Sequence, residues 1–213
     1  RGRASINNQN DMNNREFNSS ALILIGYQND YFAADGILHG VIEEVERVNH
    51  VLDNTLDLIR RLKDTQALIV ATPIIFTEDY SELQEPVGIL KIVKENRAFC
   101  ANTKGSETIS ELKEFDDRVQ EVPGKRGLNA FSNTKLDELL QENGVRDIVF
   151  AGAVTSVCVD SSARAAYERG YRVAVLSDCT TGRTIFEQEF YCNEIFPIYA
   201  EVLDHGQLLE SFS

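Results

Sequence analysis

The residue best placed to do chemistry in this chain is the cysteine at position 158. Cys158 follows an apolar run at 147–151 and stands in the first turn of a helix that the sequence predicts over 157–169. A thiol in that turn faces unpaired backbone N–H groups and the positive end of the helix dipole, and both favour the thiolate. A structural cysteine would suit the same place, because free cysteine is among the most buried residue types. Position alone therefore leaves two interpretations open, a nucleophile and a packing residue.

Strands and helices alternate along the chain around Cys158. Apolar runs predict strands, and apolar residues at helical spacing with caps and Gly or Pro stops predict helices. We expect strands over 21–25, 67–76, 117–122, 147–151, 171–176 and 198–203, and helices over 41–62, 134–143, 157–169, 186–195 and 206–211. This alternation predicts an α/β fold with a mostly parallel sheet and right-handed crossovers.

The carboxyl ends of the predicted strands indicate where a ligand would bind. In open α/β sheets the ligand crevice lies outside those ends, and Gly26, Phe76 and Gly152 fall there. Cys158 therefore lies beside the expected crevice, which favours the nucleophile. The segment 152–157 lacks the glycines of G-x-G-x-x-G, so dinucleotide binding is not expected.

Length, composition and charge limit the class of protein. The chain has 213 residues, of which 43% are apolar, and we expect one domain over 21–213 after a flexible N-terminal arm at 1–20. The formal net charge of -13 argues against nucleic acid or a membrane as partner. Since no long apolar run or signal-like segment is present, we expect a cytoplasmic protein that binds a small molecule.

Cysteine and histidine spacing predicts neither disulfides nor a metal site. The four cysteines form no C-x-x-C pair, and none of the three histidines has a second histidine or a carboxylate at metal-ligand spacing. We therefore expect reduced thiols, no metal and no cofactor, and interpret Cys179 and Cys192 as packing residues. The scarcity of histidine also removes the usual base of a Cys–His pair.

Three segments taken together resemble one known family. They cover 21–32 (ALILIGYQNDYF), 125–136 (KRGLNAFSNTKL) and 152–160 (GAVTSVCVD). In these segments the chain resembles the isochorismatase-like cysteine hydrolases, which include nicotinamidases and N-carbamoylsarcosine amidases. The resemblance extends from about 21 to 203. It implies a three-layer α/β fold with a six-stranded, mostly parallel sheet flanked by helices.

The resemblance also implies an Asp-Lys-Cys triad that hydrolyses a small amide or ureido compound through a thioester. Cys158 matches the nucleophile and Lys125 matches the lysine. A cation beside the sulfur stabilises a thiolate and the negative charge that develops in the transition state. The resemblance further implies a cis peptide at Val154–Thr155, in a loop whose backbone N–H groups form an oxyanion hole with that of the cysteine.

One position departs from the family pattern. Gly26 stands where the family has the aspartate that acts as general base, and loss of a positioned base typically costs about 10² to 10⁴ in rate. Asp30 or Asp178 could replace this carboxylate, or Lys125 and the helix terminus could support slower or different chemistry. The protein could also be a pseudoenzyme that binds a small carbonyl compound without hydrolysing it, or carry an engineered substitution at position 26.

Aromatic and cationic residues near the strand ends are candidates for substrate binding. Tyr27 and Tyr31 follow the first strand and Arg183 follows the fifth, where Arg183 could bind a substrate carboxylate. Nicotinamidases hold a metal through an aspartate and histidines after the second strand, whereas 77–81 has no histidine. A ureido or simple amide substrate is therefore favoured over nicotinamide.

The segment 186–197 is unusually aromatic for an outer helix. Such a surface predicts burial against another subunit, and the family is commonly oligomeric. We therefore expect a homo-oligomer, either a dimer or a tetramer.

Overall fold

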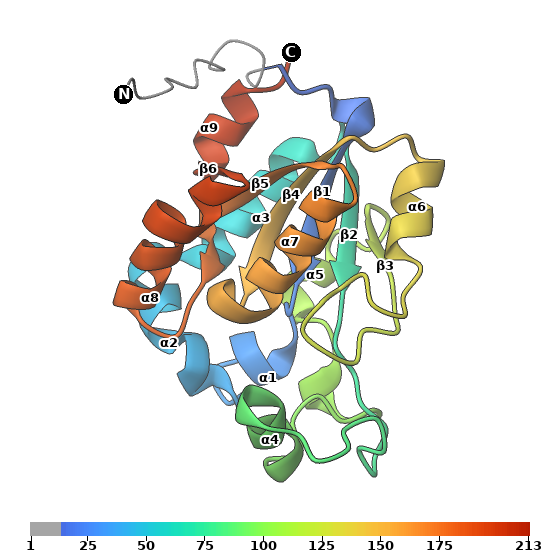
Figure 1. Cartoon of the computed structure of the whole chain (residues 1–213), viewed down its shortest axis with the longest axis vertical. Coiled ribbons are helices and arrows are strands. Elements are labelled where there is room, and N and C mark those ends of the chain that lie inside the picture. The colour runs from blue at the N-terminus through green and yellow to red at the C-terminus, as the bar shows by residue number, and fades with distance from the viewer. Residues whose placement is uncertain (1–13) are drawn as a thin grey trace, which may run out of the picture.

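A six-stranded sheet forms the centre of the computed structural model, which describes residues 14–213 (Figure 1). Neighbouring strands are parallel throughout, in the order β3-β2-β1-β4-β5-β6. The strands are β1 (Ser20–Ile25), β2 (Leu68–Thr72), β3 (Val119–Glu121), β4 (Asp147–Ala153), β5 (Arg172–Thr181) and β6 (Glu201–Leu203). The predicted α/β fold is confirmed.

Helices connect and cover these strands. The α-helices are α1 (Asn29–Phe32), α2 (His39–Asn49), α3 (Val51–Leu62), α4 (Gly88–Glu95), α5 (Ser110–Lys113), α6 (Leu136–Glu142), α7 (Asp160–Glu168), α8 (Ile185–Phe190) and α9 (His205–Glu210). Single turns of 3-10 helix occur at η1 (Phe17–Ser19), η2 (Lys104–Ser106) and η5 (Phe196–Ile198), and π-helical turns at η3 (Thr155–Val159) and η4 (Tyr191–Ile195). Within residues 14–213 we find no helix of the length and apolarity that a membrane span requires.

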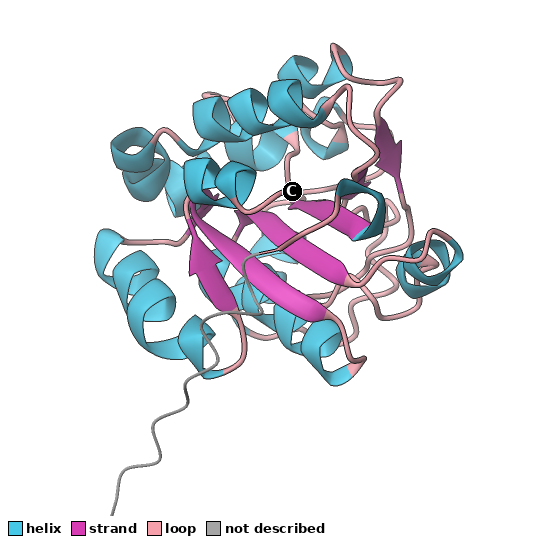
Figure 2. Cartoon of the chain, turned by 90° about the horizontal axis from the view of Figure 1, so that it is seen from above, coloured by secondary structure: helices cyan, strands magenta, loops and turns pink. Residues whose placement is uncertain are grey.

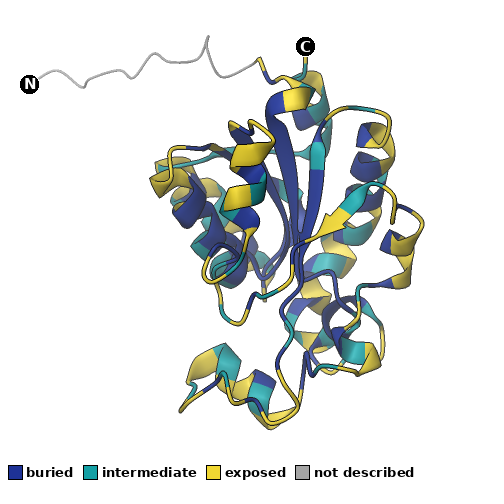
Figure 3. Cartoon of the chain, turned by 90° about the vertical axis from the view of Figure 1, so that its right-hand side faces the viewer, coloured by how far each residue is buried: buried dark blue, intermediate teal, exposed yellow. Residues whose placement is uncertain are grey.

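Helices cover both faces of the sheet, as the view along it shows (Figure 2). Leu22 and Leu24 of β1 belong to a core that includes the buried residues of α2, α3 and α9. Ile23 and Ile25 belong to a second core with α6 and α7. All residues of β1 are buried, which is the reason why its apolar run is continuous rather than alternating. The central strands are dark blue for burial in Figure 3.

The single helix predicted over 41–62 is wrong, because two helices occupy this range. His50 separates α2 from α3 in a left-handed conformation (φ 53°), and its N–H bonds to Glu46 O. The break turns the chain, so Val48, which lies on the predicted apolar face, is 53% exposed. In the sequence, apolar residues keep their helical spacing on both sides of His50, and a histidine is not a strong helix stop signal.

The predicted arm at 1–20 is wrong for residues 14–20, and residues 1–13 lie outside the described part of the chain. Arg15 is 4% exposed and forms an ion pair with Glu201. Its backbone N–H donates a hydrogen bond to Ser211 O, and its backbone carbonyl accepts one from Ser213 N. Ser20 already belongs to β1. A polar segment is thus held to the sheet by its backbone and one buried arginine.

Three predicted strands are shorter than expected, β3 among them, and the short helices α1, α4 and α5 were not predicted. β2 ends at Thr72 because Pro73 cannot donate to the sheet, and only isolated bridges at Ile74 and Phe76 follow. The strand expected over 198–203 is limited to β6, since Phe196–Ile198 forms a helical turn. No helix was predicted at α4, which lies beyond the carboxyl end of the sheet (Figure 1).

Candidate active site

The carboxyl ends of the central strands bring the candidate site together. Cys158 lies in the π-helical turn after β4 and is 7% exposed. Lys125 lies beyond β3, where it forms an isolated parallel β-bridge with Ile74, and it is 1% exposed. Gly26 directly follows β1. Residues far apart in the sequence therefore meet at the edge where a parallel sheet binds its ligands.

Lys125 and Cys158 are in direct contact. Lys125 Nζ lies 3.4 Å from Cys158 Sγ and donates a second hydrogen bond, of 2.6 Å, to Gly127 O. A cation this close favours the charged form of a thiol, and a buried ammonium group needs such acceptors. The arrangement therefore suits a thiolate nucleophile held by a lysine.

A small cavity lies over this pair. Its space for the centre of a water molecule is about 10 Å³, roughly what a single water requires. Three residues of α4, Ile89, Leu90 and Val93, form one wall, and Lys125 is the only charged residue among those described that line it. The remaining lining residues are Ile25, Gly26, Tyr31, Ile74, Phe99, Leu128, Ala153 and Cys158. The site is thus small, apolar and covered by a helix.

Gly26 has a backbone suited to glycine. Its φ is +73°, and a Cβ built there would lie 3.0 Å from Ala153 O and 3.3 Å from Cδ2 of Tyr31. The Tyr31 ring therefore borders the space that a side chain at position 26 would enter. Burial, followed by the charges of Cys158 and Asp30, raises the pKa of Tyr31, so its phenol stays protonated at neutral pH.

The cis peptide bond lies between Ala153 and Val154, so the predicted position at Val154–Thr155 is wrong by one residue. Gly152 precedes it with φ +118°, and a Cβ there would lie 1.9 Å from Ile25 O, so only glycine fits beside β1. Thr155 is fully buried, and its hydroxyl donates to Gln188 Oε1 at 2.5 Å. The loop that carries Val154 and Thr155 is thereby held between β1 and α8.

The carboxylates considered as replacements for the family aspartate have other partners. Asp30 Oδ2 accepts from Phe99 N at 2.6 Å, and Gly105 packs so closely that a Cβ there would lie 2.2 Å from Oδ1. Asp178 Oδ1 accepts from His205 N at 2.9 Å. Neither Asp30 nor Asp178 lines the cavity over Cys158. Asp30 therefore joins two loops beside the site, and Asp178 belongs to a different cluster.

The three predicted pocket residues separate in the structure. Tyr31 lines the cavity, whereas Tyr27 and Arg183 do not. The Tyr27 hydroxyl lies 2.6 Å from Thr55 Oγ1 and donates to Cys179 O at 3.1 Å, within the core. Arg183 is paired with Glu187 through Nη2 at 2.6 Å, and its side chain is 63% exposed. Tyr27 is buried in the core and Arg183 is paired with Glu187, so neither side chain lines the cavity at Cys158.

A model of the isochorismatase domain matches residues 20–207. The chain belongs to the isochorismatase family. Nicotinamidase 3 of Arabidopsis thaliana is 27% identical over 162 residues, which cover 76% of this chain and 72% of that protein. Ureidoacrylate amidohydrolase RutB of an Enterobacter species is 29% identical over 173 residues, which cover 76% of this chain and 74% of the relative.

A solved structure shows the shared fold. The cysteine hydrolase of Pseudomonas syringae has a TM-score of 0.77 to this chain at 20% identity, with 92% of this chain and 93% of that chain covered. The family predicted from the three sequence segments is thus confirmed. Within this isochorismatase fold, the sulfur and the lysine of the expected triad are in contact, while position 26 has no side chain.

The helix that covers the site, α4, was not predicted from the sequence. Apolar residues at 89, 90 and 93 alternate with charged ones at 91, 94 and 95, so an amphipathic signal was present over α4. The helix is only 8 residues long, and short amphipathic segments are easily taken for loops. No sequence pattern indicates that its apolar face would close over Cys158, because that contact depends on the loops on either side.

Proposed function

We propose that this protein is a cysteine-dependent hydrolase that cleaves the C–N bond of a small amide or ureido compound. The contact of 3.4 Å between Lys125 Nζ and Cys158 Sγ, inside a covered cavity, is the observation that carries the proposal. Two curated relatives support the reaction class, since they are named nicotinamidase and ureidoacrylate amidohydrolase. Both names denote hydrolysis of an amide-type C–N bond.

The first half-reaction forms a thioester. The Cys158 thiolate attacks the carbonyl carbon, the C–N bond breaks, and the nitrogen leaves as ammonia or an amine once it has gained a proton. Lys125 contacts the sulfur and is the only charged residue among the described ones that line the cavity. It therefore supplies both the cation that stabilises the thiolate and the proton that the leaving nitrogen needs.

The second half-reaction regenerates the thiolate. Water adds to the thioester carbon, the C–S bond breaks, and the acid is released. With glycine at position 26, the neutral amine of Lys125 left by the first step takes the proton of that water. One base in place of two predicts slow turnover, because a positioned general base typically contributes about 10² to 10⁴ in rate.

The cavity favours a small and neutral substrate. Its lining residues are mostly apolar, and the space of about 10 Å³ admits little more than a water molecule in this conformation. Arg183 is bound to Glu187 rather than free at the cavity. A short amide or ureido compound without a carboxylate beside the scissile bond therefore fits better than a ring such as nicotinamide.

Acyl-enzyme trapping combined with ammonia release tests this proposal. The full chain is incubated with short aliphatic amides, ureido compounds and nicotinamide, and intact mass and peptide mapping locate any adduct. We expect an acyl group on Cys158, ammonia release with a small amide or ureido compound, and loss of both in Cys158→Ser. Cys192→Ser is the matched control and should keep both. Ammonia release that survives in Cys158→Ser would overturn the mechanism.

A catalytically silent binder on the same fold is the second candidate. It is favoured by Gly26 and by the absence of Asp or Glu among the described residues that line the cavity. A compound that raises the melting temperature of the wild type and the Cys158→Ser variant equally, with neither adduct nor ammonia, would support this function instead.

We also propose that the chain forms a homo-oligomer and works in the cytoplasm. Phe186 and Phe190 of α8 are 77% and 43% exposed and stack on each other, and Ile198 is 73% exposed. Exposed aromatic side chains that stack on one another are typical of a subunit interface. Light scattering after gel filtration should give a dimer or tetramer, and Phe186→Ser should shift it toward the monomer. The four cysteines are free, which fits a reducing compartment.

A further inference from the structure

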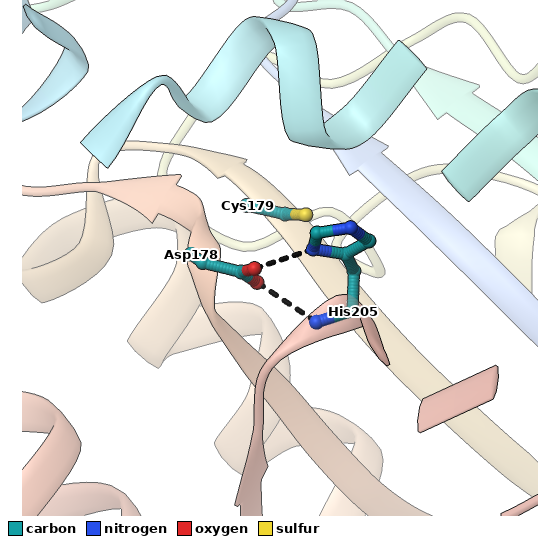
Figure 4. Close-up of side chains that lie close together, drawn as sticks. All are labelled: Asp178, Cys179 and His205. Carbon is teal, nitrogen blue, oxygen red and sulfur yellow. Dashed lines mark hydrogen bonds and ion pairs between the residues drawn. The ribbon is translucent and has the colours of Figure 1, made fainter. Parts of the chain in front are cut away.

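A second polar cluster lies away from Cys158, where β5 meets the start of α9 (Figure 4). It consists of Asp178, Cys179 and His205, whose carboxylate oxygen, sulfur and imidazole nitrogen all lie within 4.8 Å of one another. Figure 4 shows the three side chains directed toward one another from the strand and the helix. No residue of this cluster takes part in the proposed hydrolysis.

An irregularity in β5 makes this meeting possible. Phe150 pairs with Val175 and Gly152 pairs with Thr180, so β5 uses five residues where β4 uses two. In a regular strand, neighbours such as Asp178 and Cys179 would point to opposite faces. The bulge instead lets both approach His205, the first residue of α9, which is anchored by a capping box from Asp204.

The contacts of His205 resemble those of a metal-binding histidine. Its Nδ1 lies 2.5 Å from Asp178 Oδ2, and its Nε2 lies 3.7 Å from Asp57 Oδ2. Histidines that bind metals with one nitrogen commonly direct the other toward a carboxylate, which fixes the ring and the tautomer. Asp178 lies beside Nδ1, the nitrogen that would bind a cation, and Asp57 is the carboxylate on the Nε2 side of the ring.

The burial of the cluster suits a site with one open position. Cys179 is fully buried, whereas the side chains of Asp178 and His205 are 23% and 24% exposed. Three protein ligands from the inside and water from the solvent side complete a tetrahedron. Bonds of about 2.0–2.3 Å bring ligand atoms to roughly 4 Å or less, so small side-chain shifts close the site.

We propose that Asp178, Cys179 and His205 form a binding site for a zinc-type divalent cation. Sulfur and imidazole nitrogen select Zn²⁺ or Co²⁺ over Mg²⁺ and Ca²⁺, which prefer oxygen ligands. On binding, the cation replaces the thiol proton of Cys179, which goes to solvent, and it takes Nδ1 of a neutral His205 whose single proton then lies on Nε2, toward Asp57. The ion would join the β5 bulge to α9 and stabilise the C-terminal part of the sheet.

Cobalt titration of the full, untagged and metal-stripped chain tests this site. A thiolate-to-cobalt charge-transfer band should appear and saturate at one equivalent. It should disappear in Cys179→Ser and persist in Cys158→Ser and Cys192→Ser. A band that follows Cys158 or Cys192, or no band at all, would overturn the proposal.

Zinc calorimetry on variants at the rim of the site gives a second test, independent of the buried cysteine. His205→Ala should weaken zinc binding at least tenfold, and Asp57→Asn should weaken it by about tenfold through the other nitrogen. His50→Asn is the matched control, because His50 is exposed and its left-handed backbone accepts asparagine. Equal zinc affinity in the wild type and His205→Ala would also overturn the proposal, and circular dichroism verifies that each variant is folded.

Discussion

Of the three buried cysteines, Cys158 and Cys179 lie in different cores of one sheet and have opposite electrostatic neighbours. Cys158, 7% exposed, contacts the ammonium of Lys125 in a cavity whose described lining has no carboxylate. Cys179, fully buried, lies beside Asp178, and burial followed by that carboxylate raises the pKa of its thiol. Burial is common to both, so the charge of the neighbour separates a candidate nucleophile from a protonated thiol that only a metal would ionise.

Removal of the cation beside Cys158 should have the largest effect. Lys125→Met keeps the volume of the side chain but removes the charge that contacts the sulfur and the proton for the leaving group. We expect kcat/KM to fall by about 10² to 10⁴. The melting temperature should stay equal or rise, because replacing a buried charge with an apolar group is often neutral or stabilising. Lys135→Met, at a side chain that is 85% exposed, is the control; an equal loss there would remove the special role of Lys125.

Alkylation tests the difference between the cysteines directly. Burial raises the pKa of Cys192 to about 12, so only about 10⁻⁴ of that thiol is ionised at pH 8. Iodoacetamide at pH 8 should therefore modify Cys158 at least about tenfold faster than Cys179 or Cys192. Modification of Cys192 should continue to accelerate above pH 10. Peptide mass spectrometry measures all rates in one sample, and equal rates at Cys158 and Cys192 would contradict the comparison.

A carboxylate restored beside Lys125 would make the first region resemble its family. Gly26→Asp places a side chain at φ +73°, with its Cβ 3.0 Å from Ala153 O, so the free energy of unfolding should fall by about 1–2 kcal/mol. Gly26→Asn has the same strain without the charge. We expect the aspartate variant to hydrolyse faster than the asparagine variant, because it regains a general base. Equal rates would show that Tyr31 and the backbone keep this carboxylate from the site.

The sequence predicted the strands far better than their irregularities. Continuous apolar runs marked β1 and β4 because both strands are covered on two faces. The break at His50 was not predictable from periodicity, since apolar spacing continues on both sides of it. The bulge of β5 was equally invisible, because alternation and length alone do not show where a strand gains residues.

The same reason explains which parts of the two sites were found. Cys158 and Lys125 stand in segments that match a family, so their contact could be expected before the structure. Cys179 and His205 are remote in the sequence and meet only through the bulge and the cap of α9. Their spacing in the sequence therefore gives no sign of a shared site. Spacing detects ligands on one element, while tertiary contacts assemble the others.

The smallest effect is expected at the ion pair that supports the cysteine loop. Burial would raise the pKa of Glu187, but hydrogen bonds from the side chain and backbone of Arg183 outweigh burial and hold it below its usual range. A lowered pKa of a carboxyl group stabilises the fold above the pKa of the unfolded chain, and this contribution disappears as pH falls through the folded value. Arg183→Met should thus lower the free energy of unfolding by roughly 0.5 kcal/mol at pH 7.

That difference should shrink toward zero as pH falls through the lowered pKa of Glu187, because the carboxyl group is then protonated in the wild type and in the variant. Arg60→Met is the matched control, because Arg60 pairs with Glu114 while both side chains are more than half exposed, at 53% and 54%. Urea unfolding at several pH values measures both variants. Because Glu187 lies on α8 with Gln188, which accepts from Thr155, the pair also bears on the loop of Cys158. Slower alkylation of Cys158 in Arg183→Met but not in Arg60→Met would show that the Arg183–Glu187 pair influences the reactivity of this cysteine. Unchanged alkylation would show that, of these charged groups, only Lys125 does so.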